Sequence, residues 1–165
     1  MSSICMLVIF NRSGEPIFER SYQWSPTMRA LLPQTTPCLN DEAVGLLSGL
    51  VFSLRPFVSK ISPKNSADSV NCFTTEEKTY HLLETATGLK FIIVTGPNVT
   101  PMTNELQQIY QLFASTVALN PLNRPHQASE DAPSEGKADN KKPNGQIVSA
   151  SFCTALDSFL TRLSS

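Results

Sequence analysis

The first apolar run of the chain, Ile4–Phe10, is hydrophobic at every position. Alternate residues of a strand face opposite sides of a sheet, so a strand that is apolar throughout is covered on both faces. We therefore expect this strand in the middle of its sheet. A second strand is predicted at residues 17–22, and its Glu19 and Arg20 favour a place nearer the sheet edge.

A long helix is predicted over Asp41–Ile61, with Asn40 as its N-cap. Its apolar residues fall into two stripes. The first stripe comprises Val44, Leu47, Val51, Leu54, Val58 and Ile61, and the second comprises Ala43, Leu46, Leu50 and Phe57. A surface helix normally shows one apolar stripe. We therefore assign the first stripe to the sheet and the second to a partner. The predicted partner-binding residues are Leu46, Leu50, Ser53, Phe57 and Lys60.

Two glycines on the same helix, Gly45 and Gly49, are four residues apart and therefore lie on one side of it. Small residues allow another backbone to come close. The pattern fits a close approach of the helix to its own sheet and a close approach to a partner about equally well.

Three further strands are predicted at residues 69–75, 79–85 and 89–95, and the last of them is apolar on both faces. We expect this strand beside the first one, at the centre of the sheet. A helix is predicted to begin at Thr100 and Pro101, as N-cap and first helical residue, and a last helix follows near the carboxyl end. The order predicts an α+β fold in which a five-stranded antiparallel sheet carries one helix on one face and two on the other.

The length of 165 residues suits a single domain spanning 1–165. A loop is predicted at residues 25–39, which contain three prolines. Residues 122–146 are rich in proline, glycine and charged residues and have no valine, isoleucine or aromatic residue. Such a composition is typical of a flexible insertion, because it cannot bury enough apolar area to offset the entropy of ordering.

Charge and cysteine usage narrow the range of partners. The net charge of −1 gives no indication of nucleic-acid binding. The four cysteines show no C-x-x-C spacing, so we expect buried thiols in a reducing cytosol rather than a zinc site. The longest unbroken apolar run has seven residues, far short of the about 20 that a spanning helix needs. We expect no direct membrane insertion.

The sequence contains no phosphate-binding glycine loop and no nucleophile elbow. His81 lies in a predicted strand without an evident nucleophile or carboxylate, so we expect a hydrogen-bonded structural histidine. His126 lies in the predicted insertion, and Glu76 and Glu77 at a hairpin tip. We predict no catalytic residue, no cofactor and no metal.

Several segments resemble small, longin-like subunits of the TRAPP vesicle-tethering complex, of the Bet-five type. The most specific is residues 49–63, GLVFSLRPFVSKISP. Matching pieces follow the same order as in that family. They are the FNRSG turn at 10–14, Trp24, ETATG at 84–88, NPL at 120–122 and LDSF at 156–159. The resemblance covers residues 4–24, 43–122 and 151–163.

The resemblance implies a longin (profilin-like) fold and a core position in a complex that tethers vesicles between endoplasmic reticulum and Golgi. It implies a sybindin-type longin subunit as neighbour. It also implies nucleotide exchange on a Rab GTPase of the Ypt-one type by the assembled complex. The expected location is the cytoplasm, peripheral to cis-Golgi and endoplasmic reticulum membranes.

Other classes of protein share parts of this order of strands and helices. An adaptor small chain or the regulatory domain of a SNARE would share the opening hairpin. A PAS- or GAF-like sensor would also wrap helices around an antiparallel sheet, but it would need a hollow core with inward polar groups.

Overall fold

The computed structural model describes residues 4–22, 41–61, 70–119 and 149–164. In chain order the elements are β1 (Ile4–Phe10), β2 (Pro16–Ser21), α2 (Asp41–Ile61), β3 (Cys72–Thr74), β4 (Thr79–Glu84), β5 (Lys90–Thr95), α3 (Thr103–Phe113), the π-helical turn η1 (Ala114–Ala118) and α4 (Ala150–Ser164). The predicted order of strands and helices is confirmed. The predicted loop 25–39 and insertion 122–146 lie outside the described residues.

The strands form one antiparallel sheet in the order β2-β1-β5-β4-β3. The two fully apolar strands are neighbours, with Leu7 opposite Ile93 and Val8 opposite Ile92. The predicted central pairing and the edge position of β2 are therefore confirmed. β3 is shorter than predicted, because only Cys72–Thr74 pairs with β4.

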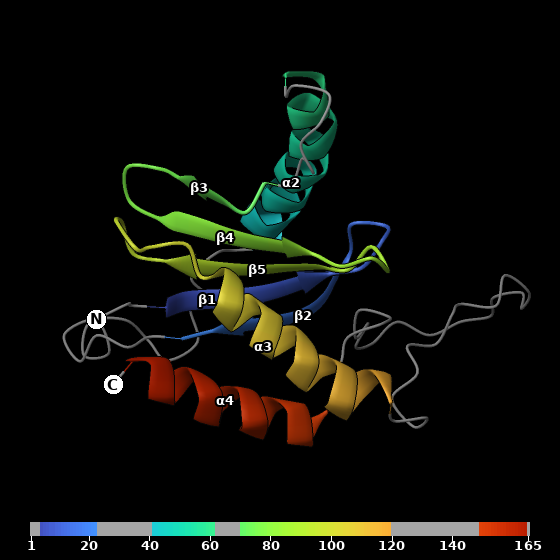
Figure 1. Cartoon of the computed structure of the whole chain (residues 1–165), viewed down its shortest axis with the longest axis vertical. Coiled ribbons are helices and arrows are strands. Elements are labelled where there is room, and N and C mark those ends of the chain that lie inside the picture. Colours follow the sequence, from blue (N-terminus) through green and yellow to red (C-terminus); the bar gives the residue numbers. More distant parts are fainter. Residues whose placement is uncertain (1–3, 23–40, 62–69, 120–148, 165) are drawn as a thin grey trace, which may run out of the picture.

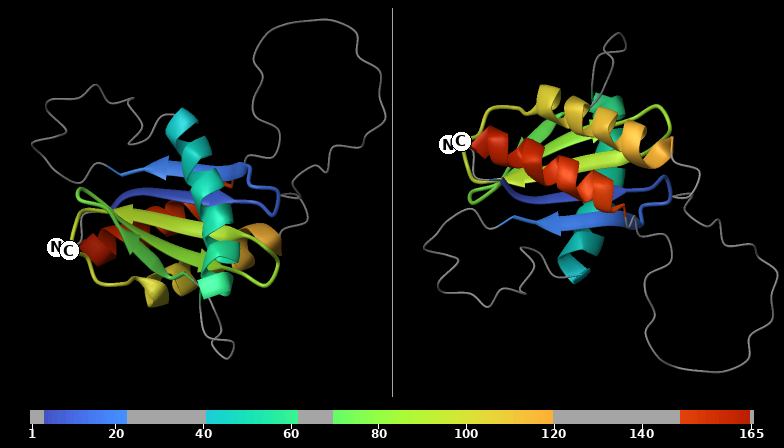
Figure 2. Two further views of the ribbon diagram at one scale, coloured as in Figure 1. Left: turned by 90° about the horizontal axis from the view of Figure 1, so that it is seen from above. Right: turned by 90° about the horizontal axis from the view of Figure 1, so that it is seen from below.

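Each face of the sheet has its own hydrophobic core, and Figures 1 and 2 show α2 on one face with α3 and α4 on the other. The α2 side packs Val44, Leu47 and Val51 on inward residues of β1, β4 and β5. The opposite side is larger and richer in aromatic residues. The predicted α+β architecture, with one helix on one face and two on the other, is confirmed.

The α4 helix is joined to the edge strand β2 and the residue after it through Asp157. Arg20 Nη2 lies 2.6 Å from one carboxylate oxygen, and the Tyr22 hydroxyl donates to the other at 3.2 Å. Burial, followed by the charge of Asp157, raises the pKa of Tyr22 well above its ordinary value. Tyr22 therefore stays protonated and keeps donating to Asp157.

The predicted start of α3 at Thr100 is wrong, because the helix begins at Thr103 with Met102 as N-cap. Met102 makes no side-chain capping bond. Its backbone N–H donates instead to Nδ1 of His81, at 3.3 Å. A buried side chain of β4 thus provides the acceptor for the amide at the start of α3. The sequence near Thr100 gave no sign of this distant contact.

The assignment of Ile61 to the sheet is also wrong, since 65% of this residue is exposed. The first three members of its stripe, Val44, Leu47 and Val51, are buried. Figure 1 shows the last turns of α2 standing clear of the sheet. The apolar stripe continues to the end of α2, but the helix extends past the edge of the sheet, so Ile61 has no sheet residue to cover.

Candidate interface on helix α2

The side of α2 that faces away from the sheet carries large exposed apolar residues. Leu46 is 70% exposed, Leu50 46% and Phe57 59%. At about 100° per residue, positions 46, 50, 53, 57 and 60 fall on one side of a helix. The structure therefore brings together all the residues predicted to bind a partner. We call the side defined by Leu46, Leu50, Ser53, Phe57 and Lys60 the outer face of α2.

The polar members of the outer face are Ser53 and Lys60, and both are exposed. The Ser53 hydroxyl donates to the Gly49 carbonyl of its own helix at 2.8 Å. It therefore adds little polarity to the surface.

A groove of about 230 Å³ runs along the outer face, between α2 and the strands β3 and β4. Leu46 and Leu50 form one wall, and Phe73 and Tyr80 form the other. The two rings stack, with centroids 4.6 Å apart and planes 7° from parallel. These two aromatic residues were not predicted from the sequence; they lie directly opposite each other in neighbouring strands. Only the register of that pairing shows that they extend the apolar surface beyond the helix.

The glycines of α2 are open to solvent rather than pressed against the sheet. A Cβ atom added at Gly45 or Gly49 would have no heavy atom of the described residues within 4 Å, apart from the nearby helix backbone. The two glycines therefore do not serve to bring α2 close to its own sheet, which was one of the two explanations of their four-residue spacing. The space next to the outer face is available to a partner.

His81 is fully buried, and both of its ring nitrogens are hydrogen-bonded within the fold. Its Nδ1 accepts the Met102 N–H, so Nε2 carries the proton and donates to Thr95 Oγ1 at 3.0 Å. Burial lowers its pKa from 6.5, opposed by the charge of Glu105. The prediction of a hydrogen-bonded structural histidine is confirmed.

Within residues 4–22, 41–61, 70–119 and 149–164, no three His, Cys, Asp or Glu side chains form a group able to hold a metal ion. In the same residues, Glu42–Ile61 is long and apolar enough to cross a membrane by length and composition. The core helix of a soluble protein meets the same criterion, and α2 packs three buried residues on the sheet.

Comparison with known proteins identifies the family. Residues 4–129 match the sybindin-like family. The chain is 33% identical to transport protein particle subunit bet5 of Schizosaccharomyces pombe, over 73% of this chain and 79% of the relative. It is 38% identical to trafficking protein particle complex subunit 1 of Dictyostelium discoideum, over 70% and 78%. It is 28% identical to trafficking protein particle complex subunit BET5 of Saccharomyces cerevisiae, over 92% of each chain.

The chain therefore belongs to the sybindin-like family, whose fold is longin-like. The resemblance to small TRAPP subunits of the Bet-five type is confirmed by these relatives, and with it a place in vesicle trafficking. The rival assignments to an adaptor chain or a SNARE regulatory domain find no such support among these relatives.

Proposed function

We propose that this chain is a non-catalytic core subunit of a TRAPP-type tethering complex in transport from endoplasmic reticulum to Golgi. Its direct neighbour is a sybindin-type longin subunit, bound through the outer face of α2. The assembled complex, not the single chain, promotes nucleotide exchange on a Rab GTPase of the Ypt-one type. The observation that carries this proposal is the row of exposed apolar residues Leu46, Leu50 and Phe57 on a helix whose other side is buried.

Binding at this face has a clear energetic basis. Full burial of one leucine or phenylalanine side chain stabilises a contact by about 1.5–3 kcal/mol relative to exposure. Leu46 and Leu50 lie one turn apart and Phe57 two turns further along the same side, and the groove beside Phe73 and Tyr80 offers a depression for a partner side chain. Contiguous exposed apolar area of this kind marks binding surfaces.

Exchange by such a complex requires no acid or base from this chain. A surface that binds the nucleotide-free GTPase better than the nucleotide-bound form shifts the equilibrium toward release. The chain contributes contact area and the position of its neighbours. We propose accordingly that it uses no cofactor and binds no nucleic acid.

We place the chain in the cytoplasm, at the surface of cis-Golgi and endoplasmic reticulum membranes, without insertion into the bilayer. The charged residues Arg55 and Lys60 in the second half of α2 support this placement, because charges within a bilayer are costly. Arg55 is in addition paired with Glu84 of β4.

Leu47→Asp and Leu50→Asp form a matched pair that tests the interface. Leu47 is buried against the sheet, so an unpaired carboxylate there should unfold or aggregate the chain. Leu50 is 46% exposed, so Leu50→Asp should leave a folded chain that no longer assembles. Co-expression with a sybindin-type subunit, followed by size-exclusion chromatography and circular dichroism, separates the two outcomes.

Glu77→Lys provides a surface control, since this exposed hairpin residue lies outside the outer face. It should fold and assemble like the unmodified chain. If Leu50→Asp also assembled normally, the outer face would not be the interface.

A further inference from the structure

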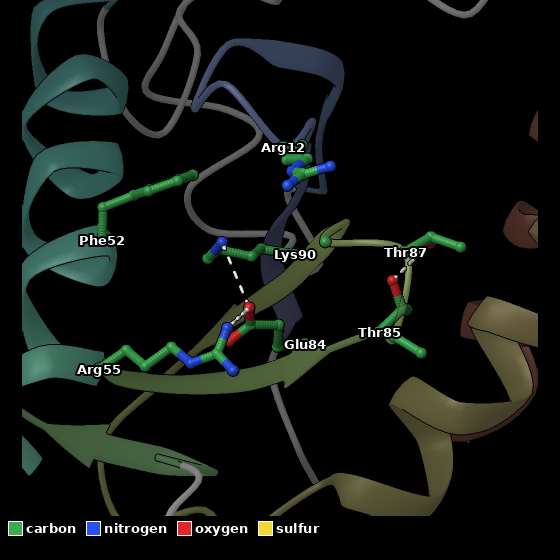
Figure 3. A pocket seen from close by; sticks show the side chains of 9 residues that line it. Arg12, Phe52, Arg55, Glu84, Thr85, Thr87 and Lys90 are labelled. Atoms are coloured by element: carbon green, nitrogen blue, oxygen red, sulfur yellow. Dashed lines mark hydrogen bonds and ion pairs between the residues drawn. The ribbon is translucent and has the colours of Figure 1, made fainter. Parts of the chain in front are cut away.

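A second hollow lies on the other flank of α2, between the β1–β2 turn and the β4–β5 hairpin (Figure 3). Its volume is about 700 Å³, and it is open to solvent. The side chains that define it are Arg12, Phe52, Arg55, Glu84, Thr87 and Lys90. They come from β4, β5, α2 and the two turns, so the fold, and not a local motif, brings them together.

Two of the three cations in this hollow are already engaged. Glu84 Oε1 lies 2.5 Å from Arg55 Nη1 and 3.6 Å from Lys90 Nζ. Lys90 is only 6% exposed, and its Nζ also lies 3.7 Å from the centre of the Phe52 ring. The carboxylate and the ring therefore hold these two cations in place.

Arg12 is the cation that remains available. In the described part of the chain its guanidinium has no hydrogen bond or ion pair, and it points into the hollow in Figure 3. Its aliphatic stem lies against Gly88, where an added Cβ would come within 3.1 Å of Arg12 Cγ. Gly88 has a φ of 84°, which favours glycine, so the turn itself keeps room for the arginine.

We propose that this hollow binds an acidic segment of a partner protein, through a carboxylate held by the Arg12 guanidinium. Three cations face one carboxylate here, so the site is positive although the whole chain has a net charge of −1. A guanidinium matches a carboxylate in bidentate geometry. A phosphate dianion would meet one available cation and the repulsion of Glu84, so the carboxylate is the better occupant.

This binding site is separate from the outer face. At about 100° per residue, Phe52 is turned by about 160° from Leu50, so the hollow and the outer face lie on opposite flanks of α2. The inference therefore stands or falls independently of the proposed assembly through Leu46, Leu50 and Phe57.

Titration of the full chain with a hexaglutamate peptide, followed by nuclear magnetic resonance, tests the site. The amide signals of Thr87 and Gly88 and the Arg12 side-chain N–H should shift, and 0.3 M NaCl should weaken the effect. Arg12→Ala should raise the dissociation constant about fivefold, the upper end for an exposed ion pair. Arg162→Ala on α4, where the arginine is also exposed, is the matched control and should change nothing.

Inorganic phosphate is the second probe. If phosphate bound through Arg12 more tightly than hexaglutamate, the assignment to a carboxylate would be overturned. Equal binding of hexaglutamate by the unmodified chain and Arg12→Ala would overturn the site itself. Leu50→Asp should bind hexaglutamate normally, so a failure of the outer-face proposal is not mistaken for a failure of this one.

Discussion

A single buried imidazole joins three elements of this fold. His81 belongs to β4, its Nε2 donates to Thr95 of β5, and its Nδ1 accepts the N–H of Met102 at the start of α3. Both ring nitrogens are used only while the ring is neutral, because a protonated Nδ1 could no longer accept. Local geometry at the start of α3 therefore depends on the protonation state of one side chain.

The pH dependence of folding should reflect this residue. In the unfolded chain His81 protonates near the ordinary pKa of 6.5, and burial lowers the pKa in the folded protein. Below about pH 6.5 the unfolded chain binds the proton more readily, so stability is complete above this pH and declines as the pH falls through it. Urea unfolding between pH 7.5 and 5.0 should show this decline.

His81→Gln is the control for this prediction. Loss of the imidazole should lower the free energy of unfolding by about 1–3 kcal/mol at pH 7.5, because a buried partner loses its hydrogen bond. The variant should also show a flatter dependence on pH. His126 is present in both proteins, so an equal slope in the two would contradict the role given to His81.

At the scale of elements, α2 contacts the rest of the fold in two different ways. Val44, Leu47 and Val51 pack on the sheet. In addition, the Ser48 hydroxyl donates to the Gly14 carbonyl in the β1–β2 turn at 2.6 Å. The β1–β2 turn thus holds α2 at one point along its length. The side of α2 that faces away from the sheet makes no such contact within the described residues.

Alanine replacements of Gly49 on α2 and Gly14 in the β1–β2 turn should change the stability of the fold in opposite directions. Gly49→Ala should raise the free energy of unfolding by about 0.5–1 kcal/mol, since alanine favours the helix and its Cβ meets nothing. Gly14→Ala should lower it by about 1–2 kcal/mol. Gly14 has a φ of 90°, and its added Cβ would lie 3.1 Å from Ser48 Oγ. Thermal and urea unfolding measure the change in the free energy of unfolding for both variants. Destabilisation by Gly49→Ala would show that the space beside Gly49 is occupied.

The sequence predicted those features that depend on periodicity. Full apolarity in β1 and β5 predicted their central pairing, and two stripes on α2 predicted one buried and one exposed apolar side. It could not predict features that depend on distant residues. The start of α3 is set by His81, and the second wall of the groove by the pairing of Phe73 with Tyr80. The exposure of Ile61 follows from where the sheet ends, which no local pattern encodes.

The basic hollow illustrates the same limit. Arg12, Arg55 and Lys90 are far apart in the sequence, and only the fold brings them to one hollow, where Arg55 and Lys90 pair with Glu84. Nothing in their local spacing indicates a cluster. Arg55 lies on α2 between Ser53 and Phe57 of the outer face, yet its side chain lines the hollow on the other flank.

At the scale of the whole molecule, the described residues carry the two surfaces that we propose as binding sites. The outer face of α2 and the basic hollow occupy opposite flanks of one helix, so two neighbours could bind at once. Such an arrangement suits a subunit in the interior of an assembly. We therefore expect the isolated chain and the assembled complex to differ in their effect on a GTPase.

Nucleotide release from a Rab GTPase of the Ypt-one type tests this difference. The purified chain alone should leave the release of a fluorescent GDP analogue at its spontaneous rate, because in the proposed function it supplies only part of the surface that binds the GTPase. The assembled complex should accelerate release, and a preparation containing Leu50→Asp should lose that acceleration because the subunit no longer joins. Arg162→Ala serves as the assembly-competent control. Strong stimulation by the isolated chain would contradict a function that arises only in the complex.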